Sequence, residues 1–186
     1  MFTQNYIDIS IARFWRRAEQ NVVDWDGQSR KVQMHYNNNY AEIGFLLNTV
    51  ATSTSKPTSY ESSLGNSYGI RFGTGYTPAQ KTDFDLEAPL MTGLTVTKGT
   101  ANITEETPGK YVAQNAFVVT NTTDAEINIW EAGMYAPVNI MQDANTKRFH
   151  YALMERTVLD APVNLKPGES KLITYKVTFN QTLNVE

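Results

Sequence analysis

The chain has 186 residues, a formal net charge of −3 at neutral pH and no cysteine. Disulfide bonds, thiolate metal sites and cysteine nucleophiles are therefore excluded, and there is no overall positive charge of the kind that nucleic-acid binding uses. Threonine and asparagine are abundant, with 22 and 16 residues. Because threonine favours strands and asparagine favours turns, we expect a mainly β protein.

The opening residues lack the basic and then apolar pattern of a signal peptide. No apolar run reaches the length of a membrane span. We therefore expect folding in a reducing cytoplasm, without membrane insertion and without nucleic acid as a partner.

Residues 7–18 have the spacing of an amphipathic helix, with apolar side chains on one face and three arginines off it. In one interpretation, this face packs on the core and the basic side faces water. In the other, the helix docks on a neighbouring subunit. The interface candidates in this segment are Ile11, Phe14, Trp15, Arg16 and Arg17.

The next segments alternate between turn, strand and helix signals. Residues 24–27 (DWDG) predict a turn that places Trp25 at the surface, where it becomes a further interface candidate. Residues 30–36 alternate like a short strand, and residues 40–51 predict a second short helix. Residues 52–67 are rich in serine and threonine and predict a linker. We therefore divide the chain into an N-terminal helical or extended attachment segment, 1–66, and a β-sandwich domain, 67–186.

The second part of the chain reads as strands separated by turns. Strands are predicted at residues 68–72, 94–98, 111–121, 126–130, 133–138 and 171–179, whereas residues 149–158 allow helix or strand. Helices of 10–15 residues between the strands, which a parallel sheet needs, are missing from this pattern. We expect an antiparallel β-sandwich, jelly-roll or immunoglobulin-like, with one or two short N-terminal helices.

Residues that could carry chemistry are few. The two histidines, His35 and His150, have no partner at a metal-ligand spacing. Asp83, Asp85 and Glu87 alternate, so on an extended segment they share one face and form a weak calcium candidate; the alternative is a solvated acidic edge. We predict no catalytic residues and no cofactor, and therefore a protein that is not an enzyme. Distant carboxylates acting in a hydrolase stay open as a minor alternative.

Several motifs follow one another between residues 67 and 180. They are YGIRFGTG (68–75), TP (77–78), DFDL (83–86), NIWEAGMY (128–135), ALMERTV (152–158) and PVNLKPGE (162–169), followed by a closing strand at 173–179. Their order resembles a recurrent pattern in small virion proteins of tailed bacteriophages. The chain departs from that pattern at WEAG (130–133), where a β-branched residue or leucine commonly lies between the glutamate and the glycine.

The resemblance implies a non-enzymatic structural protein of the virion, made in the host cytoplasm. Its expected role is capsid decoration, another head-associated position, or the neck or tail. Its expected partners are other virion proteins and further copies of itself, in a homo-oligomer that acts through symmetric contacts. The alternative is a β-sandwich module, as in a tail fibre or adhesin, that binds a host surface glycan through exposed tyrosine and tryptophan.

Overall fold

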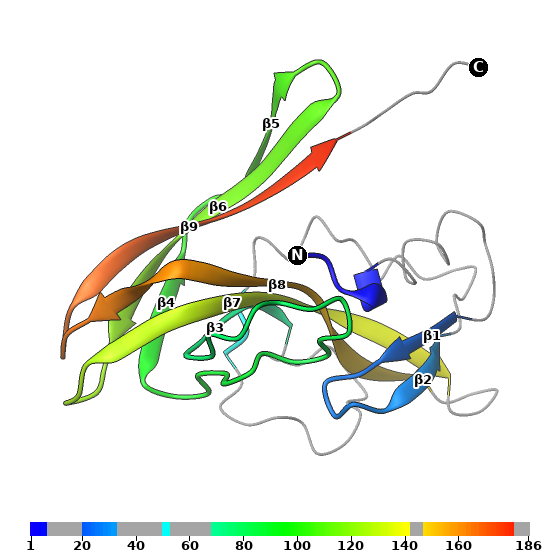
Figure 1. The fold of residues 1–186 in the computed structure, drawn as a ribbon, viewed down its shortest axis with the longest axis horizontal. Helices are drawn as coiled ribbons and strands as arrows, with labels where there is room; N and C mark the ends of the chain where they lie inside the picture. Colours follow the sequence, from blue (N-terminus) through cyan, green and yellow to red (C-terminus); the bar gives the residue numbers. More distant parts are fainter. Residues whose placement is uncertain (7–19, 33–49, 53–67, 142–146, 181–186) are drawn as a thin grey trace.

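The computed structural model describes residues 1–6, 20–32, 50–52, 68–141 and 147–180. Two antiparallel sheets and a separate β-hairpin make up this part of the chain (Figure 1). Residues 4–6 are helical. The predicted helix at 7–18 lies outside the described residues, and so does most of the predicted helix at 40–51.

The first sheet has the strand order β3-β7-β8. Its strands are β3 (Gly69–Gly73), β7 (Ile127–Met141) and β8 (Lys147–Leu165). The strand predicted at 68–72 is confirmed as β3. The two strands predicted at 126–130 and 133–138 are one long strand, β7, in which irregularities of register lie beside Trp130 and after Met134. The ambiguous segment 149–158 is strand, within β8.

The second sheet is built around β6 (Lys110–Asn121). β9 (Ser170–Asn180) pairs with one edge of β6 over nearly its whole length. β4 (Leu94–Lys98) and β5 (Asn102–Thr107) share the other edge, with β4 beside the second half of β6 and β5 beside the first. The predictions of β4, β6 and β9 are confirmed, whereas β5 was not predicted.

The hydrophobic core lies between the two sheets. Along β6, Phe117 and Val119 are fully buried while Val118 between them is exposed, as expected for a strand with one face on the core. The ring of Phe117 meets that of Phe72 from β3 edge to face, with 6.3 Å between centroids. The mainly β, antiparallel sandwich expected from the sequence is therefore confirmed.

Asn121 joins the two connections that cross between the sheets at one end of the sandwich. It is fully buried. Its side-chain amide donates to the carbonyls of Ala125 and Leu165, at 2.7 and 2.9 Å. Its backbone N–H donates to Glu169 and its carbonyl accepts from Gly168, both at 3.0 Å. One buried asparagine thus supplies the hydrogen bonds that hold the turn after β6 against the turn before β9.

The described N-terminal residues pack on the sandwich. The backbone of Thr3 donates to Met154 of β8, and that of Arg156 donates to Met1, both at 3.0 Å, so residues 1–3 extend the first sheet beyond β8. β1 (Gln20–Val23) and β2 (Ser29–Val32) form an antiparallel hairpin, and Val22 belongs to the core. The predicted domain boundary near residue 66 stays a prediction.

The predicted turn at 24–27 is confirmed, but the structure corrects the expectation that its tryptophan is exposed. Trp25 is 4% exposed and packs with Tyr135 and Tyr151. The carboxylate of Asp24 accepts from the N–H groups of Asp26 and Gln28 and thereby shapes the turn. That turn directs the indole inward, because the hairpin lies against the first sheet.

Candidate functional site

A three-stranded extension of the second sheet projects beyond the rest of the described chain (Figure 1). It consists of β5, the first half of β6 and the second half of β9, and is called the arm below. All six residues of β5 are exposed. Among the described residues, β5 and β9 each pair with β6 alone. Each therefore presents one edge of backbone N–H and C=O groups without a strand partner there.

Ion pairs stiffen the arm across its outer face. Oε2 of Glu106 lies 2.7 Å from Nζ of Lys110, and Oε1 lies 2.9 Å from Nζ of Lys176 on β9. The hydrogen bonds from these two ammonium groups lower the pKa of Glu106 to about 2. The turn between β5 and β6 is held by Glu105, whose carboxylate accepts from the N–H of Gly109 at 3.0 Å. Gly109 has a φ of 80°, which glycine adopts without strain.

Apolar side chains are exposed to solvent on the outer face of the second sheet. Val118 and Leu172 are direct cross-strand partners, and they are 42% and 68% exposed. Ile103 on β5 is 68% exposed. Because Val118 and Leu172 lie side by side, they form one continuous apolar contact surface on the sheet.

A buried carboxylate holds the segment 74–90, which runs from β3 towards β4. Glu131 of β7 has no exposed surface. One of its oxygens accepts from the N–H groups of Gly75 and Ala88, at 3.1 and 2.8 Å. The other accepts from the N–H of Glu87 at 3.2 Å. This carboxylate therefore replaces the missing strand partners of the loop backbone.

Arg156 of β8 binds Glu131 and reaches two more carboxylates. Its Nε lies 2.8 Å from Glu131, Nη1 lies 2.8 Å from Asp83, and Nη2 lies 3.4 Å from Glu87. Desolvation opposes the charge of Arg156, but the hydrogen bonds to Asp83 and Glu131 outweigh it, so the pKa of Arg156 is raised. Two members of the calcium candidate thus converge on a guanidinium.

The third member of that candidate, Asp85, turns to a different partner. Its carboxylate accepts from the hydroxyl of Tyr135, and the same hydroxyl accepts from the N–H of Leu86 at 3.0 Å. Burial and the adjacent charge of Asp85 raise the pKa of Tyr135 well above its ordinary value. Within the described chain, no group of three acidic or histidine side chains is arranged to hold a metal ion. The weak calcium candidate at Asp83, Asp85 and Glu87 is therefore not supported by the side-chain arrangement of the described residues.

Residues from several of the motifs that carry the sequence resemblance meet at this network, whereas the motif at 162–169 lies beside Asn121. A Cβ atom added at Gly73 would lie 2.5 Å from Oε1 of Glu131, and one added at Gly75 would lie 2.7 Å from the same atom. One added at Gly133 would lie 2.8 Å from Leu86. The glycines, the acidic segment, Glu131 and Arg156 therefore form one closely packed unit that fixes the loop on the first sheet.

The remaining interface candidates are not placed. Ile11, Phe14, Trp15, Arg16 and Arg17 lie outside the described residues. An aromatic pair that sequence analysis did not identify lies at the surface instead. Tyr76, 69% exposed, has its ring centroid 6.4 Å from that of the half-buried Trp130. No local pattern in the sequence indicates this pair, because Tyr76 lies in the loop after β3 and Trp130 lies on β7.

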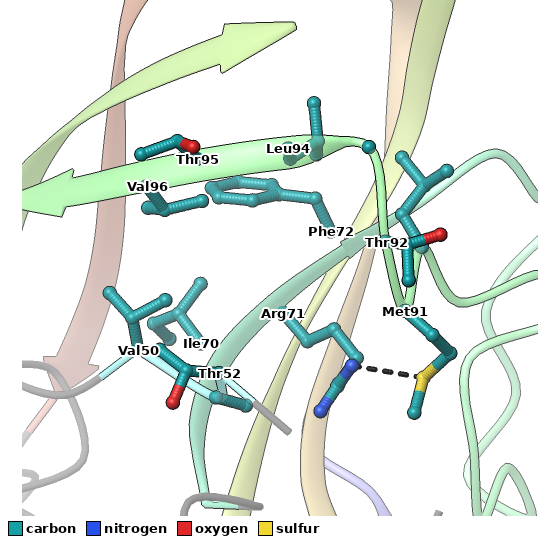
Figure 2. A pocket seen from close by; sticks show the side chains of 13 residues that line it. Val50, Thr52, Ile70, Arg71, Phe72, Met91, Thr92, Leu94, Thr95 and Val96 are labelled. Atoms are coloured by element: carbon teal, nitrogen blue, oxygen red, sulfur yellow. Dashed lines mark hydrogen bonds between the residues drawn. The ribbon is translucent and has the colours of Figure 1, made fainter. Parts of the chain in front are cut away.

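A pocket of about 390 Å³ opens between β3 and β4 (Figure 2). Its apolar lining includes Ile70, Phe72 and Val96. Arg71 lies at one end and donates to the sulfur of Met91 at 2.9 Å. Burial lowers the pKa of Arg71, although the charges of Tyr135 and Asp85 oppose that shift.

Comparison of the chain with protein-family models, with curated proteins and with solved structures found no match. In the described ranges, no helix is both long and apolar enough to cross a bilayer.

Proposed function

We propose that this chain is a non-enzymatic structural protein of a tailed bacteriophage particle that acts through contacts with neighbouring protein subunits. The observation that carries the proposal is the arm, which extends from a packed β-sandwich and exposes every residue of β5. The sequence resemblance over residues 67–180 supplies the setting, a virion. The position within it is a head-associated or decoration site, or the neck or tail.

The chemistry of the arm and its sheet suits subunit contacts. The arm offers two strand edges, and the outer face of its sheet adds the apolar pair of Val118 and Leu172. Strand edges supply backbone hydrogen bonds, and adjacent apolar side chains supply buried area on association. In a symmetric particle, weak contacts are repeated in every copy, so that modest individual energies give a stable assembly.

Deletion of the gene from a phage that encodes this chain tests the proposal. We expect particles that are unstable or incomplete, and restoration of infectious particles when the chain is supplied from a plasmid. A plasmid copy that encodes Leu172→Asp and Val118→Asp should restore fewer particles, because both changes place charge on the apolar contact surface. Normal particles and normal infectivity after deletion would contradict the proposal.

A second candidate function is binding of a host surface glycan, and Tyr76 and Trp130 favour it. Exposed aromatic rings present an apolar face with a polar edge, as surfaces that recognise sugars do. The test is adsorption of the purified protein to host cells before and after removal of surface polysaccharide. Loss of adsorption in both Tyr76→Ala and Trp130→Ala, with adsorption retained in the control Tyr111→Ala, would favour glycan binding over the structural role.

A further inference from the structure

An irregularity in β7 places Trp130 beside the loop that follows β3. Ile129 and Ala132 both belong to the core, although residues three apart on a regular strand lie on opposite faces. The register between β7 and β8 shifts at this point, between Ile129 and Glu131. A bulge of this kind redirects a side chain. In the described chain, Trp130 belongs to neither apolar cluster, and its ring centroid lies 6.4 Å from that of Tyr76. The bulge therefore turns the indole towards Tyr76 instead of the core.

The backbone on both sides of Tyr76 is held by carboxylates. The N–H of Gly75 donates to Oε1 of Glu131 at 3.1 Å, and the N–H of Thr77 donates to Oε2 of Glu87 at 2.8 Å. Tyr76 itself is 69% exposed. Its ring is therefore presented at the surface on a fixed backbone, so that a ligand would not have to order this part of the loop.

Negative charge exceeds positive charge next to this aromatic pair. Three carboxylates, those of Asp83, Glu87 and Glu131, converge on the single guanidinium of Arg156 and leave an excess of two formal negative charges. Lys81, the one basic residue of the same loop, forms no ion pair with them in the described chain. A positively charged group is therefore attracted to this surface, and a negatively charged group is repelled.

Glu87 is the carboxylate of this group that is open to a ligand. It lies 3.4 Å from Arg156, compared with 2.8 Å for each of the other two, and its side chain is 36% exposed. The N–H and the hydroxyl of Thr77 both donate to Oε2, and the backbone hydrogen bond is the main reason that the pKa of Glu87 is lowered. A carboxylate has about four acceptor sites on its two oxygens. Oε1 therefore has room for a further donor.

We infer that Tyr76, Trp130 and Glu87 bind an arginine side chain of a neighbouring protein subunit. The inference rests on the proposed function and deepens it by naming the chemistry of one contact. A cation is attracted to an aromatic face when it lies within about 6 Å of the ring centroid. Because the two centroids are 6.4 Å apart and the rings are inclined by 59°, one guanidinium can lie within that distance of both.

Arginine suits this site better than lysine or a sugar does. A guanidinium is planar, so it can stack on an aromatic ring and donate through its edge to the carboxylate of Glu87. The ammonium group of lysine is a strongly hydrated point charge that does not stack. A neutral sugar can stack on the rings, but it gains little from the excess negative charge, and an acidic sugar is repelled by it.

Titration of the purified protein with small probes tests the inference. Binding is observed by NMR at the indole N–H signal of Trp130, which is assigned with the variant Trp130→Phe. The probes are N-acetyl-arginine amide, N-acetyl-lysine amide and methyl glucoside. We expect the arginine probe to shift the signal saturably and to bind about threefold more tightly than the lysine probe. We expect methyl glucoside to leave the signal unchanged.

Matched variants show whether the three residues form the site. Tyr76→Ala and Glu87→Gln should each weaken binding of the arginine probe about threefold. Glu105→Gln, which neutralises an exposed carboxylate on the arm, is the control and should bind as the wild type does. Thermal unfolding of each variant shows that it is folded. The absence of a saturable shift with the arginine probe, or equal weakening by the control, would overturn the inference. A shift with methyl glucoside alone would overturn it in favour of the glycan candidate.

Phage particles separate this inference from the proposed function. Particles made with a chain that carries both Tyr76→Ala and Glu87→Gln should contain less of it than wild-type particles do. If the doubly changed chain is incorporated at the wild-type level, the arginine contact is rejected and the proposed function stands. If the wild-type chain is missing from particles, the proposed function fails, and the titration still decides whether the site binds arginine.

Discussion

The Nε atom of Arg156 donates to Oε2 of Glu131 at 2.8 Å, between two strands that are adjacent in the first sheet. Both side chains are almost completely buried, with 3% and 0% exposed. The pair is the centre from which the segment 74–90 is held, because Glu131 accepts from its backbone and Arg156 binds two of its carboxylates. The loop therefore depends on a charge pair formed within the sheet.

Arg156→Ala is expected to destabilise the protein by about 3–5 kcal/mol, because it leaves Glu131 buried without its counter-charge. The measurement is urea unfolding followed by circular dichroism. Lys171→Ala is the matched control. It removes an exposed pair with Glu169, and we expect a loss of less than ~1 kcal/mol. Equal effects of the two changes would show that the buried pair contributes no more than a surface one.

Gly73→Ala is expected to loosen the same loop. The added methyl group would lie 2.5 Å from Oε1 of Glu131 and 2.7 Å from the carbonyl oxygen of Ala88. Overpacking of this kind costs about 1–3 kcal/mol. Trypsin cleavage after the exposed Lys81 reports the loop directly and should be faster in Gly73→Ala. Gly168→Ala has no atom within 4 Å of the new methyl group, but its φ of 73° strains a turn outside this loop. It is therefore the control for a loss of stability elsewhere, and it should leave cleavage after Lys81 at the wild-type rate.

Trp25→Ala is expected to cost about 3–5 kcal/mol, because the indole fills the cluster with Tyr135 and Tyr151. Tyr76→Ala removes a ring that is mostly in water, and its cost should stay within about 0.5 kcal/mol. Thermal unfolding of the two variants measures both losses of stability. A small loss for Trp25→Ala would mean that the tryptophan is a surface residue, as its turn position had suggested.

Tyr135 makes stability depend on alkaline pH. The folded state raises the pKa of Tyr135 above its ordinary value, so above about pH 10 the unfolded chain releases a proton that the folded chain keeps. The free energy of unfolding therefore falls as pH rises through that range. Tyr135→Phe should flatten this slope, measured by urea unfolding at several pH values. An unchanged slope would assign it to other groups.

Glu106 makes the arm sensitive to acid. Its folded pKa of about 2 lies below the ordinary 4.5, so its stabilising contribution is present above pH 4.5 and is lost as pH falls towards 2. Carboxyl chemical shifts during an NMR titration measure this pKa. Lys176→Ala should raise it, high salt should raise it as well, and Lys81→Ala should leave it unchanged. An ordinary pKa in the wild type would contradict the ion pairs of the arm.

The strands that alternate apolar and polar residues could be predicted from the sequence, and β4 has the predicted bounds, Leu94–Lys98. β5 could not, because NITEET has one apolar residue and no buried face to give a period of two. β7 was divided into two because Glu131 and Gly133 interrupt the alternation. Tertiary contacts explain why these two residues occur within the strand, since Glu131 binds the loop and Gly133 makes room for Leu86.

The interaction partners of the acidic segment could not be predicted from the local sequence pattern. Asp83, Asp85 and Glu87 alternate as a metal-binding strand does, but their partners, Arg156 and Tyr135, lie 50 or more residues away in the chain. The burial of Trp25 could not be predicted for the same reason. The residues of the turn predict its backbone conformation, but they do not predict which surface the hairpin packs on. The resemblance of the motifs to phage proteins stays a prediction, and the packing of several of them around one loop is seen only in the structure.

Quantitative mass spectrometry of purified phage particles shows whether this chain is a component of the virion. The particles come from a phage that encodes this chain, and the chain is quantified against the major capsid protein with isotope-labelled reference peptides. We expect the chain to be present in a fixed ratio to the capsid protein. A ratio near one, or a simple fraction set by capsid symmetry, indicates a decoration or head-associated protein, and a few per cent indicates the neck, tail or fibres. Absence of the chain from intact particles would contradict a role in the virion.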